Sequence, residues 1–264
     1  KTSLFIFLKF LRDNMYHRIP PEIVDGSIGQ QVFHNIRDEK ISWNIGIDIP
    51  EKYLIEYEAE LMGPVGNPRI VSERVMTLLD NQESYYFLAI KDDKGYIQDF
   101  ESEKQNAIIM SSDMLFLSIA NNSVLYNLRE YILGWRFYSS LNIANEKIRR
   151  PTFIEQSPTL REDAGNLSSL LHFLMTEHRS IFDELQHLLE LAIPGFKGLT
   201  VKAYGGRGEV MAFWREDGVD DMLSLADLSD GILRFICWTV ICLQPNPPSL
   251  ICIDEPDQCL HPRT

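Results

Sequence analysis

The first regular pattern in the chain has a period of two residues. From Ile41 to Ile49, apolar residues alternate strictly with polar or small ones. Such alternation is typical of a strand that buries one face. Similar segments follow at short intervals and are read as strands: 55–61, 69–78, 85–91 and 96–100. Because short turns join successive strands, the pattern predicts an antiparallel β subdomain over residues 41–100.

A row of glutamates lies on one face of the second segment. Glu56, Glu58 and Glu60 alternate with Tyr57 and Ala59. The row allows two interpretations, a cation site or the solvated face of the sheet. We favour the solvated face, because carboxylates at spacing two all point outward into water.

The other patterns are mainly helical. Residues 4–11 have helical spacing, 107–191 are predicted to form a mainly helical lobe, and 168–191 within it read as one amphipathic helix. The segments 199–204 and 210–215 flank a glycine cluster at 205–208. That cluster could be a phosphate loop, but it joins two strands instead of leading into a helix. A hairpin turn is therefore the better interpretation.

Near its C-terminal end, the chain has a short apolar run that leads into two carboxylates. Residues 249–253 read Ser-Leu-Ile-Cys-Ile, and Asp254 and Glu255 follow. A continuous apolar run indicates a strand buried on both faces of a parallel sheet, whose carboxyl ends bind ligands. Asp254 could then hold Mg²⁺ through its water shell, and Glu255 could orient and deprotonate a water molecule. This is the Walker B pattern, although an acidic turn after a strand would look similar.

The segment just before this strand predicts a phosphate-binding helix start. Ser229 is a natural helix N-cap, and Gly231 permits a close approach to the backbone. The N-terminus of the helix that follows would present free N–H groups and a partial positive charge, which suits a phosphate.

Composition and charge narrow the class of protein. The 264 residues include 45% hydrophobic and 24% charged residues, which is ordinary for a globular chain. A net charge of −13 argues against a surface that coats nucleic acid non-specifically. No apolar run is long enough to span a bilayer, so we expect no membrane association. All four cysteines lie within residues 237–259 without metal-ligand spacing, which favours buried free thiols in a reducing cytoplasm.

Together these motifs resemble a known family. Residues 228–235 read Leu-Ser-Asp-Gly-Ile-Leu-Arg-Phe, and Asp254-Glu255-Pro256 is followed by Leu260-His261-Pro262. The set is similar to the signature motif and Walker B of ABC-type ATPase heads of the SMC, RecF and OLD families. It looks closest to the RecF-like group of bacterial ATPases. Segments 135–138 and 160–167 resemble this group as well, although Ala164-Gly165 departs from its usual pattern.

The resemblance implies an α/β fold of the P-loop NTPase type. It would have a parallel core sheet, the antiparallel subdomain, the helical lobe, and a signature helix and Walker B core at 199–264, all within one head over 1–264. Such a head needs a P-loop before its first helix, and the chain begins Lys1-Thr2 directly before one. Lys1 would then reach the β- and γ-phosphates of ATP, and Thr2 would ligate Mg²⁺ together with Asp254. The glycine part of the loop is expected just before residue 1.

The resemblance also implies how such heads work. Ser229 and Gly231 would contact the γ-phosphate held by a second head, giving a head-to-tail homodimer or higher homo-oligomer around ATP. Gln30 or Gln31 is a candidate nucleotide sensor, and Asp257 and Gln258 are candidate interface residues.

The function expected from this resemblance is ATP hydrolysis that switches a partner. That partner would be an effector protein, such as a nuclease or toxin, or a nucleic acid, in antiphage defence or DNA repair. Two alternatives stay open: a nucleotide-gated scaffold with little turnover, and the ATPase part of an OLD-type nuclease. The presence of Glu255 favours hydrolysis over the scaffold.

Overall fold

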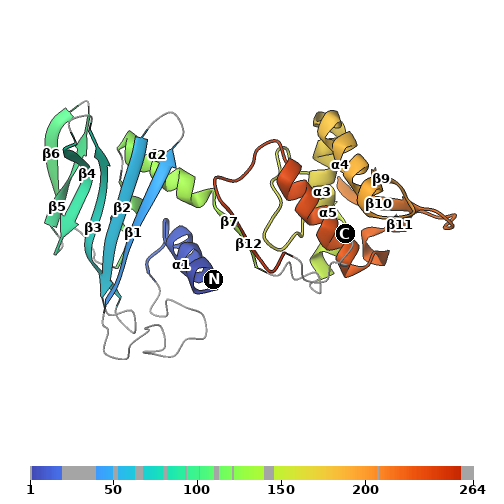
Figure 1. The fold of residues 1–264 in the computed structure, drawn as a ribbon, viewed down its shortest axis with the longest axis horizontal. Coiled ribbons are helices and arrows are strands. Elements are labelled where there is room, and N and C mark those ends of the chain that lie inside the picture. The colour runs from blue at the N-terminus through green and yellow to red at the C-terminus, as the bar shows by residue number, and fades with distance from the viewer. Residues whose placement is uncertain are drawn as a thin grey trace. The chain divides into compact units, whose positions relative to one another are not determined.

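The computed structural model describes most of the chain. The described residues are 2–19, 40–49, 53–62, 68–79, 82–92, 94–100, 102–109, 113–120, 122–139, 146–206 and 208–256. The contacts divide the chain into two compact units, Lys1–Trp135 and Arg136–Thr264. Figure 1 shows both units, which are described separately below.

The first unit is built on a six-stranded antiparallel sheet whose strands are neighbours in chain order (Figure 1). Its strands are β1 (Lys40–Ile49), β2 (Tyr53–Met62), β3 (Arg69–Leu78), β4 (Ser84–Lys91), β5 (Lys94–Asp99) and β6 (Ser102–Ile109). Its helices are α1 (Thr2–Asp13), the 3₁₀ helix η2 (Phe116–Ser118) and α2 (Ser123–Leu133). The period-two prediction is confirmed, since each predicted strand of 41–100 is present and pairs with its neighbour.

The sheet buries one face because its apolar positions alternate. Ile55, Tyr57 and Leu61 of β2 are buried, and the ring of Phe7 of α1 packs tilted against that of Trp43 of β1, with centroids 5.5 Å apart. The opposite face carries the glutamate row, where Glu58 accepts a hydrogen bond from Asn44 at 2.8 Å. That face is a polar surface, as we expected.

Glu73 is an exception to this sidedness, because its carboxylate lies on the buried face of β3. Its side chain is completely buried. Tyr57 Oη donates to Glu73 Oε1 at 2.9 Å, and the backbone N–H groups of Phe116 and Leu117 donate at 2.6 and 3.0 Å. Glu73 thus holds the start of η2 against the sheet.

The second unit combines three helices with two small sheets. Its helices are α3 (Leu167–Glu177), α4 (Arg179–Ala192), α5 (Asp230–Leu243) and the 3₁₀ helices η3 (Glu146–Arg149) and η4 (Leu225–Asp227). Its strands are β7 (Arg136–Ser139), β8 (Thr152–Phe153), β9 (Phe196–Ala203), β10 (Glu209–Glu216), β11 (Leu223–Ser224) and β12 (Ile251–Asp254). One hydrophobic core joins α3, α4, α5 and the β9–β10 hairpin.

The strands of this unit follow two different patterns. β9 and β10 form the predicted antiparallel hairpin, with Gly205 and Gly208 at positive φ in its turn. β12 pairs in parallel with β7, from Ile251 opposite Arg136 to Asp254 opposite Ser139. Among the described strands, β7 and β12 are the pair that runs parallel. The predicted parallel core is therefore represented by two strands, whereas the described sheets are mostly antiparallel.

Several sequence predictions were wrong in detail. The helix predicted over 168–191 is two helices, because His178 leaves helical geometry with φ −131° and ψ 56° and ends α3. Residues 4–11 do lie in a helix, α1, in which Leu4 is exposed and Phe10 and Leu11 are buried. The range 107–191 also contains β7 and β8 and spans the boundary between the two units.

The cysteine prediction holds for two of the three described thiols. Cys237, Cys242 and Cys252 are free, and Cys237 and Cys252 are buried while Cys242 is exposed. Burial raises the pKa of the Cys237 thiol to about 12, so it stays protonated and unreactive. Cys259 lies outside the described residues.

Candidate functional site

The N-terminus of α5 has the geometry that the sequence predicted. Ser229 has extended backbone angles and caps the helix, and its Oγ accepts a hydrogen bond from the backbone N–H of Ile232 at 3.3 Å. Because Oγ acts as an acceptor there, its hydroxyl hydrogen is left to donate elsewhere. Ser229 is exposed and Gly231 half-buried. A solvent-facing helix start with a free hydroxyl donor can receive an anion.

Arg149 of η3 holds the segment that leads into this helix. Its Nη1 donates to the carbonyl oxygens of Leu225, Ala226 and Leu228 at 3.2, 2.9 and 2.7 Å. Its Nη2 pairs with Asp230 Oδ1 at 2.5 Å. Sequence reasoning missed this contact, because no local pattern relates residues 76 to 81 positions apart.

The second predicted site lies at the carboxyl end of β12. Asp254 is the last residue of the strand and is half-buried, and Glu255 follows it and is exposed. Cys252 is buried, whereas Ile251 and Ile253 are half-buried, so the strand is less enclosed than predicted. Glu255 has a φ of +50°, in the left-handed region that residues other than glycine rarely adopt. Such backbone conformations cluster at functional sites.

A tryptophan ties the end of this strand to α5. Trp238 Nε1 donates to the carbonyl oxygen of Pro256 at 3.0 Å. Trp238 lies eight residues after Asp230, so the contact is about 12 Å along the helix axis from the start of α5 at 1.5 Å per residue. The acidic end of β12 is therefore anchored to the middle of α5, away from Ser229.

The 155–169 segment supports the strand that pairs with β12. Glu162 Oε1 accepts a hydrogen bond from the backbone N–H of Phe137 at 3.0 Å, and Tyr138 Oη donates to the carbonyl of Leu160 at 2.8 Å. Both bonds reach β7 from the segment 160–167 that the sequence singled out. That segment thus braces the strand that pairs with β12.

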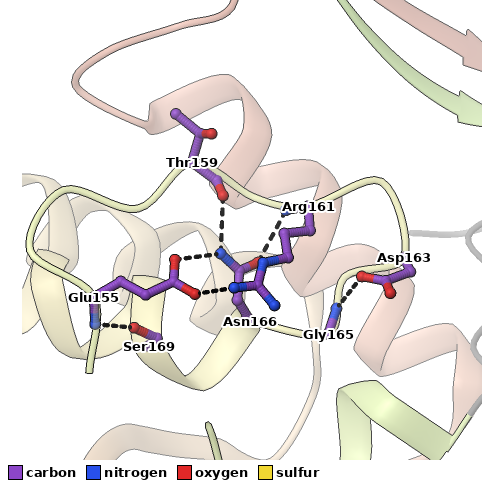
Figure 2. A network of polar contacts seen from close by, with 7 residues as sticks. All are labelled: Glu155, Thr159, Arg161, Asp163, Gly165, Asn166 and Ser169. Atoms are coloured by element: carbon purple, nitrogen blue, oxygen red, sulfur yellow. Dashed lines mark hydrogen bonds and ion pairs between the residues drawn. The ribbon is translucent and has the colours of Figure 1, made fainter. Parts of the chain in front are cut away.

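Figure 2 shows how this segment is fixed in turn. Asn166 is only 1% exposed. Its Nδ2 donates to Glu155 Oε2 at 3.2 Å and to the Thr159 carbonyl at 2.9 Å, and its Oδ1 accepts from the Arg161 backbone at 2.9 Å. Arg161 also forms an ion pair with Glu155. Each polar atom of the buried amide is satisfied, which makes the loop rigid.

Another residue of η3, Lys147, contacts the 160–167 loop. Lys147 Nζ donates to Asp163 Oδ2 at 2.8 Å, and the bond holds the pKa of Asp163 below its usual range. Lys147 and Arg149 therefore join the 160–167 loop and the segment before α5 to one short helix.

The structure does not test the remaining predicted site residues. Thr2 begins α1 in the first unit, and its side chain is not described. The other candidates lie outside the described residues: Lys1, Gln30, Gln31, Asp257 and Gln258. The structure thus brings Ser229, Gly231, Asp254 and Glu255 into one unit and leaves the P-loop residues untested.

The acidic end of β12 offers carboxylate oxygens of the kind that Mg²⁺ takes from proteins. Within the described residues, no three His, Cys, Asp or Glu side chains gather as a metal site. Mg²⁺ is usually bound through one or two protein oxygens and completed by water and phosphate. Asp254, half-buried at a strand end, is a donor of this kind.

No helix within the described ranges is both long and apolar enough to cross a membrane. Comparisons with curated proteins and with solved structures found no match. A family model described as "AAA domain, putative AbiEii toxin, Type IV TA system" matches residues 1–264. Because that match covers the whole chain, the protein belongs to this AAA-domain family and is a P-loop ATPase domain of mixed helices and sheets.

Proposed function

We propose that this protein hydrolyses ATP between two heads arranged head to tail, as ABC-type ATPases of the SMC, RecF and OLD kind do. The observation that carries the proposal is the end of β12. There a parallel strand delivers Asp254 and Glu255 together, with Glu255 exposed in a left-handed backbone conformation. The membership of an AAA-domain family supports nucleotide binding.

In this proposal each residue at the strand end has one task. Asp254 and Thr2 would hold Mg²⁺, which supplies charge neutralisation at the phosphates when bound. Glu255 would accept a proton from the water that attacks the γ-phosphorus, so the products are ADP and inorganic phosphate. Lys1 would contact the β- and γ-phosphates.

The helix start would serve the other head. Ser229 Oγ–H and the N–H groups near Gly231 would donate to the γ-phosphate bound by the partner chain. The anchoring of β12 to the middle of α5, through Trp238, supports this division. A chain whose Ser229 lies away from its own Walker B end is suited to complete the site of a second copy.

ATP would then act as the link in a dimer, and hydrolysis as its release. We propose that the cycle switches an effector protein of the toxin or nuclease kind, or a nucleic acid, in the cytoplasm. The family description, which names a toxin of a type IV system, favours a role in defence over DNA repair. A scaffold with little turnover is the second candidate, and Glu255 argues against it.

Glu255→Gln in the full-length protein tests the catalytic assignment. The amide keeps the shape of the carboxylate but cannot take the proton, so kcat should fall about 100-fold or more while ATP binding persists. The ATP-bound dimer should become long-lived in size-exclusion chromatography. Glu190→Gln, an exposed change on α4, is the matched control and should keep the parent rate. Turnover of Glu255→Gln at the parent rate would refute the assignment.

A further inference from the structure

The side chain of Arg149 makes four contacts to residues 225–230, the segment that leads into and begins α5. One guanidinium reaches three backbone carbonyl oxygens of the chain entering α5, those of Leu225, Ala226 and Leu228, and the carboxylate of Asp230, the first residue of the helix. Its side chain is only 22% exposed. Arginine can do this because its planar group carries five donors in a fixed fork, which a lysine lacks.

Two of these contacts lie directly before and directly after Ser229. Leu228 directly precedes Ser229, and Asp230 directly follows it. Arg149 therefore holds the backbone carbonyl just before Ser229 and the Asp230 side chain just after it, while the Ser229 side chain stays exposed to solvent. Loss of the clamp would free the orientation of the hydroxyl without removing any group from it.

The same short helix is tied to the loop that braces β7. Lys147 pairs with Asp163, and Glu162, the neighbour of Asp163, accepts the Phe137 N–H of β7. Polar contacts thus connect β7 to the 160–167 loop, this loop to η3, and η3 to the start of α5. Arg150, which directly follows Arg149, differs from it. Its side chain forms an ion pair with Glu146 of η3 and not with the segment before α5.

We propose that Arg149 is a positioning residue that sets the geometry of Ser229 for the ATP bound by the partner head. The inference rests on the proposed function, and it assigns Arg149 to the signature side of the composite site. Arg149 touches neither phosphate nor water in this role. It acts through Ser229.

The first test separates binding from turnover. In the full-length protein, Arg149→Met should lower kcat for ATP hydrolysis about tenfold or more, with the Kd for ATP changed by less than about twofold. Arg150→Met, an equal loss of charge at the adjacent position, should leave both values near the parent. If Arg149→Met perturbs folding, shown by circular dichroism, Arg149→Lys is used, because it keeps the charge but cannot span the four acceptors.

The second test asks which side of the site Arg149 serves. Arg149→Met mixed with Lys1→Ala should regain activity, since one composite site then has an intact Lys1 from one chain and an intact Arg149 and Ser229 from the other. Arg149→Met mixed with Ser229→Arg should stay inactive, because both chains are then defective on the signature side. The opposite pattern would overturn the inference.

Failure of the inference and failure of the proposed function give different results. If Lys1→Ala and Ser229→Arg do not complement although heterodimers form, the composite site itself is wrong. If that pair complements while Arg149→Met and Arg149→Lys hydrolyse ATP at the parent rate, only the role of Arg149 is wrong.

Discussion

The surroundings of Glu73 change the pKa of its carboxyl group strongly. Burial raises its pKa to about 7, although the N–H groups of Phe116 and Leu117 and the Tyr57 hydroxyl favour the charged form. A carboxyl with a raised pKa in the folded state binds protons more tightly there than in the unfolded chain. Its stabilising contribution is therefore full at low pH and is lost as the pH rises from about 4.5 to about 7.

This environment predicts a specific pH dependence of stability. Between pH 5.5 and 7.5 the raised pKa should lower the free energy of unfolding of the first unit by about 2 kcal/mol. Glu73→Gln should be less stable than the parent at pH 5.5, since its NH₂ group opposes one backbone donor, and its stability should fall less over that range. Urea unfolding at several pH values checks this. Equal pH dependence in both proteins would contradict the assignment of Glu73.

Single residues differ in how far the sequence could predict them. Ser229 was predicted as a cap, because the preference for serine at a helix start is local. Arg149 and Glu73 were not found. Their partners lie far along the chain, and Glu73 stands in a segment whose alternation alone would allow any residue. Only the packing of η2 against β3 shows why a carboxylate is buried there.

At the scale of elements, the loop of Figure 2 supports β7, the strand that pairs with β12. Its rigidity rests on Asn166, and its contact to β7 rests on Glu162. The sequence predicted this segment through its resemblance to a family pattern, but not its role. β7 is four residues long and pairs with a strand more than 100 positions later, which no periodicity reports.

Substitution of Asn166 should reveal this dependence. Asn166→Ala removes partners from the Arg161 N–H and the Thr159 carbonyl, so unfolding should become easier by about 3 kcal/mol. Asn166→Asp keeps the acceptor but places a second carboxylate against Glu155, so it should be less stable at pH 7 than at pH 4.5 relative to the parent. Thermal unfolding measures both. An Asn166→Asp protein as stable as the parent at pH 7 would show that the network is not formed.

Strands and helices with strict periodicity were predicted correctly. The point at which a helical pattern is interrupted was not. The alternation of β1 to β3 produced correct strands because each strand buries one face. The continuous helical pattern of 168–191 hid the break at His178, since the apolar stripe continues from α3 into α4. Tertiary packing decides such breaks, and the local pattern does not record it.

At the scale of the whole molecule, the family assignment is combined with the proposal that Ser229 and the Asp254-Glu255 pair serve different nucleotides. The chain is an AAA-family P-loop ATPase domain in which Ser229 and the Asp254-Glu255 pair occupy separate positions of one unit. The family match does not say whether these features serve the same nucleotide. The in-trans role of Ser229 is therefore the central claim, and it separates a composite dimer from a self-contained ATPase.

Mixing two inactive variants tests this claim most directly. Ser229→Arg should bind ATP and fold like the parent, yet it should neither dimerise with ATP nor hydrolyse it, because arginine occupies the place of the partner's phosphate. Lys1→Ala should be inactive because it removes a cation from the triphosphate. In a self-contained ATPase, Ser229 would be only a cap worth about 1 kcal/mol.

The measurement is the ATPase rate of the equimolar mixture against each variant alone. The account predicts recovery to at most about half of the parent rate, since only mixed dimers form around ATP and each contains one intact site out of two. A mixture that stays inactive although heterodimers are demonstrated would contradict the in-trans role of Ser229.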